Sequence, residues 1–233
     1  MRPVRRVWIT RAQPGAARTA VRLTALGYEP VVAPLLTIRP LPDALAPAPD
    51  FAAVAALAFT SANGVEAFAA LGPARQLRDR PVFAVGDATA EAARAAGFTD
   101  ARSAAGDIHA LARLIAASPI QGLILAPGAR EPAGDLPALL PDHILQRLPV
   151  YAAEETDVTS PPAFDAVMLH SPRAGRALAA ILTPQAAAQR LAVCISAAAA
   201  APLAALGFAE IRIADAPDEA SMLTALGKSV SAV

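Results

Sequence analysis

Residues 57–64, Leu-Ala-Phe-Thr-Ser-Ala-Asn-Gly, decide the fold of this chain. An apolar run over residues 54–59 leads into the stretch, and a helical pattern over residues 65–71 follows it. The pattern predicts a buried strand, a tight loop and a helix. Because a helix N-terminus presents free N–H groups and partial positive charge, such a loop suits a carboxylate or a phosphate.

The predicted helix has residues typical of both its ends. Asn63 is expected to cap the N-terminus, and Glu66 stands three residues later, where its side chain can return to the cap amide. Gly72 is expected to end the helix in the left-handed conformation.

A second copy of the pattern lies downstream. Residues 166–174, Ala-Val-Met-Leu-His-Ser-Pro-Arg-Ala, form an apolar run that ends in a short polar loop, and a helix is expected over residues 176–182. A single offset along the sequence relates several landmarks of the two copies: Thr60 to His170, Ser61 to Ser171, Val85-Gly86 to Ile195-Ser196 and Gly97-Phe98 to Gly207-Phe208. With one extra residue, the same offset relates the helix starting at Asp107 to the helix starting at Asp218. These pairs indicate an internal duplication.

Strands and helices alternate along the rest of the chain. A strand over residues 7–10, a helix opening at Pro14 and a strand over residues 31–38 form the first unit. Further strands are predicted over residues 81–85, 101–103, 123–125 and 145–151, with a loop over 126–132 and two proline-containing crossings over 40–49 and 153–162. This order predicts parallel sheets with helices on both faces, and ligands bind such sheets beyond the carboxyl ends of the strands.

Composition and charge exclude several classes of protein. The chain has 233 residues, enough for two domains of roughly a hundred residues each. Without a long apolar run or a signal peptide, it is expected to be a cytoplasmic protein that does not enter a membrane. Twenty basic and twenty acidic side chains cancel, which argues against nucleic-acid binding. The single cysteine, Cys194, lies in an apolar run and is expected in the core.

The loops lack the motifs of common cofactors. There is no Gly-x-Gly-x-x-Gly for a dinucleotide, no Walker lysine and no cluster with metal-ligand spacing. No serine lies in the elbow of an acyl-transfer nucleophile. The sequence therefore predicts neither cofactor nor metal.

At this point the residues resemble a known family. Thr10-Arg11, residues 59–65 (Phe-Thr-Ser-Ala-Asn-Gly-Val), residues 84–90 (Ala-Val-Gly-Asp-Ala-Thr-Ala) and Val150-Tyr151 are similar to uroporphyrinogen-III synthase, in order and over essentially the whole chain. Thr-Ser-Ala-Asn-Gly-Val is the most specific piece. The resemblance implies cyclisation of hydroxymethylbilane to uroporphyrinogen III with loss of water and inversion of the last pyrrole ring, without a cofactor.

The resemblance also implies a particular domain arrangement. Two similar α/β domains of the flavodoxin-like or Rossmann-like type are expected, joined by a two-stranded linker with the substrate in a cleft between them. Residues 1–35 and 155–233 would form one domain and residues 39–149 the other, with hinge strands at 36–38 and 150–154. Spacing alone suggests two consecutive halves instead.

Site residues carried over from the resemblance lie at strand ends. Tyr151 is expected to assist departure of the substrate hydroxyl, or else to be an aromatic residue of the hinge strand. Substrate-binding residues are expected to be Thr10, Arg11, Thr60, Ser61, Ala62, Asn63, Gly86, Thr89, His170, Ser171, Pro172, Arg173, Ser196, Ala197 and Ala198. The alanine run after Ser196 departs from the glycine and threonines usual in the family. We expect backbone amides to hold the eight carboxylates of the linear tetrapyrrole, and the protein to be a monomer.

One alternative comes from another class. A two-domain sensor or binding protein could close on an anionic small molecule without any chemistry. Only an assay of turnover distinguishes it from the synthase.

Overall fold

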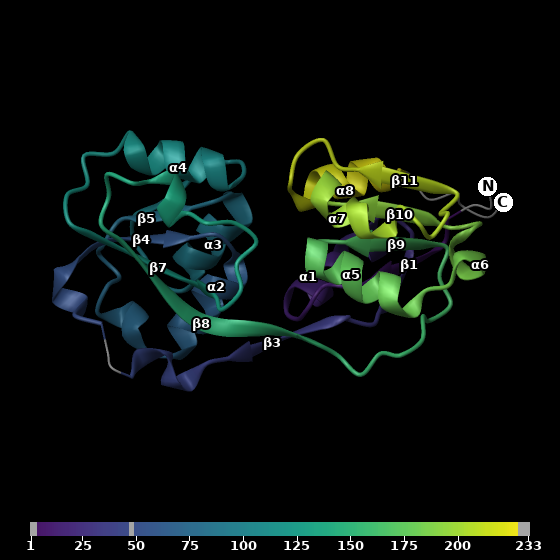
Figure 1. Cartoon of the computed structure of the whole chain (residues 1–233), viewed down its shortest axis with the longest axis horizontal. Coiled ribbons are helices and arrows are strands. Elements are labelled where there is room, and N and C mark those ends of the chain that lie inside the picture. Colours follow the sequence, from purple (N-terminus) through teal and green to yellow (C-terminus); the bar gives the residue numbers. More distant parts are fainter. Residues whose placement is uncertain (1–3, 47–48, 228–233) are drawn as a thin grey trace. The chain divides into compact units, whose positions relative to one another are not determined.

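The computed structural model describes residues 4–46 and 49–227, which form two compact units (Figure 1). Unit 1 comprises the described residues up to Thr37 and from Glu154 onward, and unit 2 comprises those within Ile38–Ala153. Unit 1 therefore combines the purple N-terminal part of Figure 1 with its green-to-yellow C-terminal part. The division falls inside two strands, β3 (Leu36–Pro40) and β8 (Leu145–Glu155).

Unit 1 is a doubly wound α/β unit with a five-stranded sheet in the order β11-β10-β9-β1-β2. Its neighbouring strands all pair in parallel. The strands are β1 (Arg6–Ile9), β2 (Glu29–Val32), β9 (Ala166–Leu169), β10 (Leu191–Cys194) and β11 (Glu210–Ile213). The helices are α1 (Gly15–Ala25), α5 (Pro172–Ile181), α6 (Pro184–Ala187), α7 (Ala197–Ala200) and α8 (Glu219–Leu226), with a 3₁₀ turn η5 (Ala201–Leu203).

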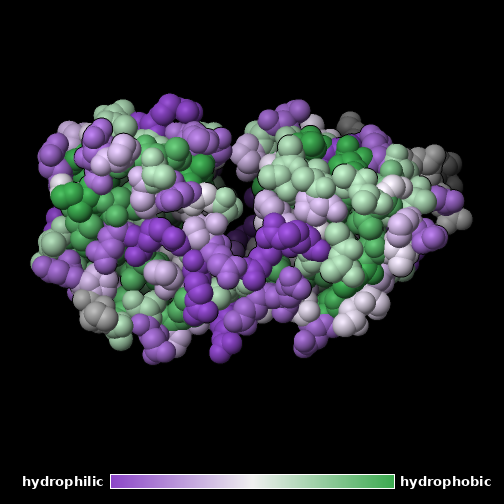
Figure 2. All heavy atoms as spheres, viewed as in Figure 1, coloured by the Kyte–Doolittle hydropathy of each residue, from purple (hydrophilic) through white to green (hydrophobic). Residues whose placement is uncertain are grey.

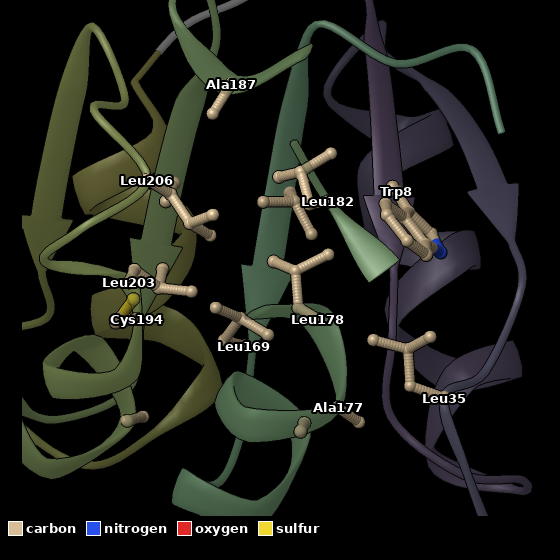
Figure 3. Close-up of a cluster of buried hydrophobic side chains, with 14 of the residues drawn as sticks. Trp8, Leu35, Leu169, Ala177, Leu178, Leu182, Ala187, Cys194, Leu203 and Leu206 are labelled. Carbon is tan, nitrogen blue, oxygen red and sulfur yellow. The ribbon is translucent and has the colours of Figure 1, made fainter. Parts of the chain in front are cut away.

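Alternation along the strands of unit 1 gives each face its own core. Val7 and Ile9 pack with α1 and α8 on one face, whereas Trp8, between them, packs with α5 and α7 on the other. Figure 3 shows the second core, in which Leu169 and Cys194 from the sheet meet Leu178 from α5.

Two side chains of this core have specific roles in it. Trp8 donates its indole N–H to the Ala33 carbonyl over 2.7 Å, so its one polar atom is satisfied, and its ring centroid lies 5.2 Å from that of Phe164. Cys194 is fully buried, and burial raises the pKa of its thiol to about 12. The prediction that Cys194 is a core residue is confirmed.

Unit 2 has a six-stranded sheet in the order β3-β8-β7-β4-β5-β6. The pairs from β8 to β6 are parallel. The remaining strands are β4 (Val54–Phe59), β5 (Val82–Ala84), β6 (Ala101–Ser103) and β7 (Leu123–Ala129). Helices α2 (Ala62–Ala70) and α3 (Asp87–Ala95) pack on one face and α4 (Ile108–Ala116) on the other, with 3₁₀ turns η1 (Pro42–Leu45), η2 (Phe51–Ala53), η3 (Pro73–Arg75) and η4 (Pro137–Leu139). The predicted α/β fold class is confirmed.

The internal duplication is visible in the backbone. Ser61 and Ser171 cap α2 and α5 with φ/ψ of −162°/153° and −163°/155°. Gly86 and Ser196 precede α3 and α7 at −159°/176° and −160°/164°. Asp107 and Asp218 cap α4 and α8 through their carboxylates. The repeated landmarks therefore hold equivalent positions in the two units.

Some local predictions about helix ends were wrong. Ser61 caps α2 in place of Asn63, because Ser61 is extended and its Oγ accepts the Gly64 N–H over 3.2 Å. Asn63 lies inside the first turn, so Glu66 does not complete a capping box with it. Gly72 is left-handed, with φ of 96°, as predicted. Helix α5 begins at Pro172, earlier than expected, because Ser171 caps it and proline fits the first helical position.

Other differences concern strand boundaries. The strand predicted over residues 31–38 is two strands, β2 and β3, which belong to different sheets and flank Pro34. Strand β7 continues through the loop predicted at 126–132 as far as Ala129, because β8 pairs with it. The stretch 40–49 contains the turn η1, the stretch 153–162 begins as strand, and residues 47–48 lie outside the described residues. No helix in the described segments is long and apolar enough to cross a membrane.

Candidate active site

Strand ends and helix N-termini form the candidate site in each unit. In unit 2, β4 leads into α2 and β5 into α3, and in unit 1, β9 leads into α5 and β10 into α7. Parallel pairing brings these carboxyl ends to one edge of each sheet. The first amides of each helix have no partner within the helix, and the helix dipole adds partial positive charge there.

In unit 2 the cap of α2 contacts the predicted catalytic tyrosine. Ser61 Oγ lies 3.1 Å from the Tyr151 hydroxyl, while it also accepts the Gly64 N–H. Tyr151 lies on β8, is 6% exposed and packs its ring in the unit 2 core. Burial raises the pKa of the Tyr151 phenol, although the hydrogen bond to Ser61 opposes this shift. The phenol therefore keeps its proton at neutral pH and is available as a donor.

The first turn of α2 packs tightly against the end of β7. A Cβ atom at Gly64 would lie 2.9 Å from the Pro127 carbonyl oxygen, so only glycine allows this approach. Beside it, Thr60 and Pro127 help to line a cavity of about 30 Å³. This volume holds a water molecule and is too small for a tetrapyrrole.

The other predicted residues of unit 2 differ in accessibility. Ala62 and Asn63 are partly buried in the first turn of α2, and Thr60 is exposed. Gly86 is partly buried ahead of α3, whereas Thr89 is 4% exposed and belongs to the interior. Helix α3 also carries an acidic residue, Asp87, in its first turn, whereas α2, α5 and α7 carry none. The N-terminus of α3 is therefore the least favourable of the four for an anion.

In unit 1 a charged cluster lies after β1 and β9. Arg11 Nη1 donates to Glu219 Oε2 over 2.8 Å, and His170 Nε2 lies 3.1 Å from the same oxygen. The exposed fractions of the side chains are 31% for Arg11, 8% for His170 and 13% for Glu219. Arg11 and His170 were predicted site residues, and the structure brings them together through Glu219, which the sequence analysis missed.

Burial and mutual contact set the charges of this cluster. Burial alone would raise the pKa of the Glu219 carboxyl, but contacts with His170, Thr19 and Arg11 lower it to about 2. Burial lowers the pKa of His170, and the hydrogen bond to Glu219 only partly opposes this. At neutral pH Glu219 is therefore ionised, His170 is neutral, and Arg11 supplies the positive charge.

The side chains of the remaining predicted residues of unit 1 are buried, cap a helix or lie at its start. Thr10 is fully buried and donates to the Met168 carbonyl over 2.7 Å, so its hydroxyl does not face the loops. Ser171 and Ser196 accept the N–H groups of Ala174 and Ala199 as caps. Pro172 and Arg173 are partly buried in the first turn of α5.

The alanine run after Ser196 forms the short helix α7. Its first residues, Ala197 and Ala198, are exposed. Figure 2 shows an apolar, pale green surface over this part of unit 1. Nothing in this run offers a hydroxyl apart from Ser196, whose Oγ already serves as the cap.

Fold and site together define the class of this protein. It consists of two doubly wound α/β units with helix N-termini at the carboxyl edges of parallel strands, and no candidate metal cluster occurs among the described residues. The family model described as "Uroporphyrinogen-III synthase HemD" matches residues 17–224. The chain therefore belongs to the uroporphyrinogen-III synthase family.

Solved structures show the same fold. A uroporphyrinogen-III synthetase from Helicobacter pylori is 19% identical, with a TM-score of 0.62, and the match covers 95% of this chain and 97% of that one. A mutant uroporphyrinogen III synthase from the extremely thermophilic bacterium Thermus thermophilus is 18% identical, with a TM-score of 0.53, and the match covers 97% of this chain and 100% of that one. No curated protein sequence matches the chain.

The family defines the enzyme class. Its members are cyclising lyases that act on hydroxymethylbilane in tetrapyrrole biosynthesis, the route to porphyrins and haem, and this chain is an enzyme of that class. The predicted family, fold class and activity are confirmed. The roles of individual residues are proposals.

Proposed function

We propose that this chain converts hydroxymethylbilane to uroporphyrinogen III with Tyr151 as the acid that assists loss of the hydroxyl group. The contact between Ser61 and Tyr151 at the carboxyl end of β4 carries this proposal. The Gly64 N–H donates to Ser61 Oγ, which leaves the Ser61 hydroxyl hydrogen free to point at the Tyr151 oxygen. The Tyr151 hydrogen is then directed to a third group, the substrate.

The proposed step balances in atoms and protons. The C–O bond of the hydroxymethyl group breaks, and its oxygen leaves as water with the proton of Tyr151. For the last ring to be inverted, the freed methylene first bonds to the already substituted carbon of that pyrrole, and the bond from this carbon to its old methylene bridge then breaks. That bridge bonds to the unsubstituted carbon of the same pyrrole, and the proton released there restores the Tyr151 phenol. The raised pKa of Tyr151 is compatible with this cycle, because the phenol is regained readily at neutral pH.

We further propose that helix N-termini hold the substrate carboxylates. Helices α2 and α5 are the strongest candidates, because each has at least two full turns and no acidic residue at its start. A hydrogen bond from an N–H group to a charged acceptor contributes roughly 1.5–3 kcal/mol. Several such bonds, spread over the strand ends of a unit, would hold an anionic ligand without one dominant side chain. Arg11 and His170 add a charged position in unit 1.

An assay of product isomers tests the function. Freshly generated hydroxymethylbilane is incubated with and without the protein, and the uroporphyrin isomers are resolved after oxidation. We expect an excess of the type III isomer over the control without protein. The type I isomer alone, together with tight binding, would identify a binding protein instead.

The expected surroundings of the enzyme follow from its pathway. We propose that it works in the cytoplasm as a monomer, with the linear tetrapyrrole as its small-molecule substrate. Size-exclusion chromatography with light scattering tests the oligomeric state, and a mass twice that of the chain would contradict it.

A further inference from the structure

We propose that Glu219 and Gly15 are positioning residues that hold the Arg11 guanidinium in place to bind a substrate carboxylate. The inference rests on the proposed function, since it assigns a carboxylate of the same substrate to unit 1. Neither residue was expected to take part from the sequence.

The geometry around Arg11 fixes one edge of its guanidinium and leaves the other available. Nη1 donates to Glu219 Oε2 over 2.8 Å and lies 3.4 Å from the Thr19 hydroxyl. Nε and Nη2 donate to no described residue, although they lie against Gly15. A Cβ atom at Gly15 would be 2.5 Å from Nε and 2.9 Å from Nη2. The guanidinium is thus held against the bare Cα of the first residue of α1.

The second unit shows that the fold does not need this cluster. By the duplication, Thr60 corresponds to His170 and Ile108 to Glu219, so unit 2 forms the same strand-helix arrangement without these charges. A buried ion pair is weak evidence for stability, because the cost of removing charges from water offsets their attraction. A role in binding explains why unit 1 carries one.

The cluster also lacks hydrogen-bond partners. Among the described residues, three buried side-chain nitrogen and oxygen atoms have no partner, and two of them are His170 Nδ1 and Glu219 Oε1. Buried polar atoms are normally paired, so an unpaired couple in one cluster indicates a group that is missing from it. Both atoms are acceptors, because neutral His170 donates from Nε2 and Glu219 is ionised, so a donor such as water fits them and an anionic ligand would pair with Arg11 instead.

The local charge favours an anion as this ligand. Arg18 and Arg22, on the exposed side of α1, act on Arg11 and lower its pKa together with burial, which is the larger cause. Glu219 is the acidic partner of Arg11, and His170 is neutral at neutral pH because burial lowers its pKa. The edge of the Arg11 guanidinium that faces away from Glu219 is therefore the side on which an anion can bind.

Single and double substitutions test the positioning role. Gly15→Ala displaces the guanidinium and leaves every charge in place, and Glu219→Gln removes the carboxylate charge at constant size. We expect each to raise KM for hydroxymethylbilane about 3- to 10-fold, with kcat changed less than about 2-fold. Arg11→Ala should raise KM by about 10-fold or more. Arg113→Ala, which removes an exposed charge from the last turn of α4 in unit 2, is the control and should change KM less than about 2-fold.

The decisive measurement is the coupling to Arg11. If Glu219 and Gly15 act through Arg11, neither substitution changes KM further in the Arg11→Ala background. Equal increases in both backgrounds, or unchanged KM in the Gly15→Ala single variant, would overturn the inference. Thermal unfolding of each variant verifies the fold, and Gly15→Ala alone decides the matter if Glu219→Gln does not fold. A wild type that forms no type III isomer would overturn the proposed function itself.

Discussion

Three serines that cap helices allow the contact between Ser61 and Tyr151 to be isolated. Ser61, Ser171 and Ser196 all cap helices in nearly the same backbone conformation, and each Oγ accepts one N–H over 3.2–3.3 Å. Of these serines, Ser61 is the one whose Oγ also lies beside Tyr151. Replacing each by alanine therefore removes the same cap, and Ser61→Ala additionally removes the hydrogen bond to the phenol.

The structure sets the expected magnitudes. Loss of a serine cap costs about 1 kcal/mol of stability, and this cost should be similar in all three variants. The contact with Tyr151 is worth about 1 kcal/mol as a neutral hydrogen bond, so Ser61→Ala should lower kcat/KM about 5-fold more than Ser171→Ala or Ser196→Ala. Tyr151→Phe should lower kcat about 10- to 100-fold, because a general acid contributes strongly but the hydroxyl can depart unaided.

The assay is the initial rate of type III isomer formation, measured after circular dichroism has verified each fold. The Ser61→Ala effect should disappear in the Tyr151→Phe background, because both substitutions remove one hydrogen-bond chain. Equal kcat/KM for Ser61→Ala and Ser171→Ala would refute the reasoning. So would an undiminished single-turnover rate for Tyr151→Phe, which would make Tyr151 a residue of the strand core alone. A loss of a thousandfold or more in any one serine variant would reveal a dominant hydroxyl and contradict binding by distributed amides.

Three further predictions concern stability. Leu178→Ala should lower the free energy of unfolding by about 2–5 kcal/mol in chemical denaturation, because Leu178 is fully buried between α5 and the sheet; a loss under about 1 kcal/mol would contradict this packing. Gly64→Ala should cost about 1–3 kcal/mol by pushing α2 from the Pro127 carbonyl, whereas Gly86→Ala, whose nearest atom is 4.0 Å from the added Cβ, should cost less; equal melting temperatures would refute the close approach. The pKa of Glu219 is lowered from 4.5 to about 2, so its ionised form adds at most about 3 kcal/mol to the free energy of unfolding above pH 4.5, and this contribution is lost as the pH falls toward 2. In acid titration the free energy of unfolding of Glu219→Gln should therefore fall less steeply than that of the wild type. Identical curves would contradict this prediction.

The sequence predicted the fold well because periodicity and repetition are local signals. Strand β4 and strand β6 occur where the patterns place them, and the two helices that the duplication pairs begin directly after Asp107 and Asp218. Strand boundaries that depend on hydrogen bonding to a neighbouring strand were harder to predict. Strand β7 extends through Pro127 and Gly128 because β8 offers it hydrogen bonds, which no local propensity indicates. The cap of α2 was misplaced because Asn63 and Ser61 are both good caps, and the backbone angle of Ser61 decided between them.

The candidate site was predictable only in part. Strand-end loops are recognisable from the sequence pattern, so Ser61, His170 and their neighbours could be predicted as site residues. Side-chain contacts between segments that are distant in the sequence cannot be recognised in this way. Glu219 and Arg11, which form an ion pair, are 208 positions apart. The sequence offered one signal: Glu219 follows a helix cap at a place where the other half of the duplication has the apolar Ile108. Thr10 and Thr89 show the converse error: both were predicted to bind substrate because they are polar residues of the motifs, and both are buried in the structure.

The buried thiol of Cys194 makes this enzyme convenient for site-specific labelling. It is the only cysteine of the chain, it is inaccessible, and its pKa of about 12 keeps it protonated at the pH of maleimide chemistry. Cysteines introduced on the surface, one in each unit, would therefore react with fluorophores against almost no background. Energy transfer between such a pair would report, molecule by molecule, how the separation of the units responds when the tetrapyrrole is added.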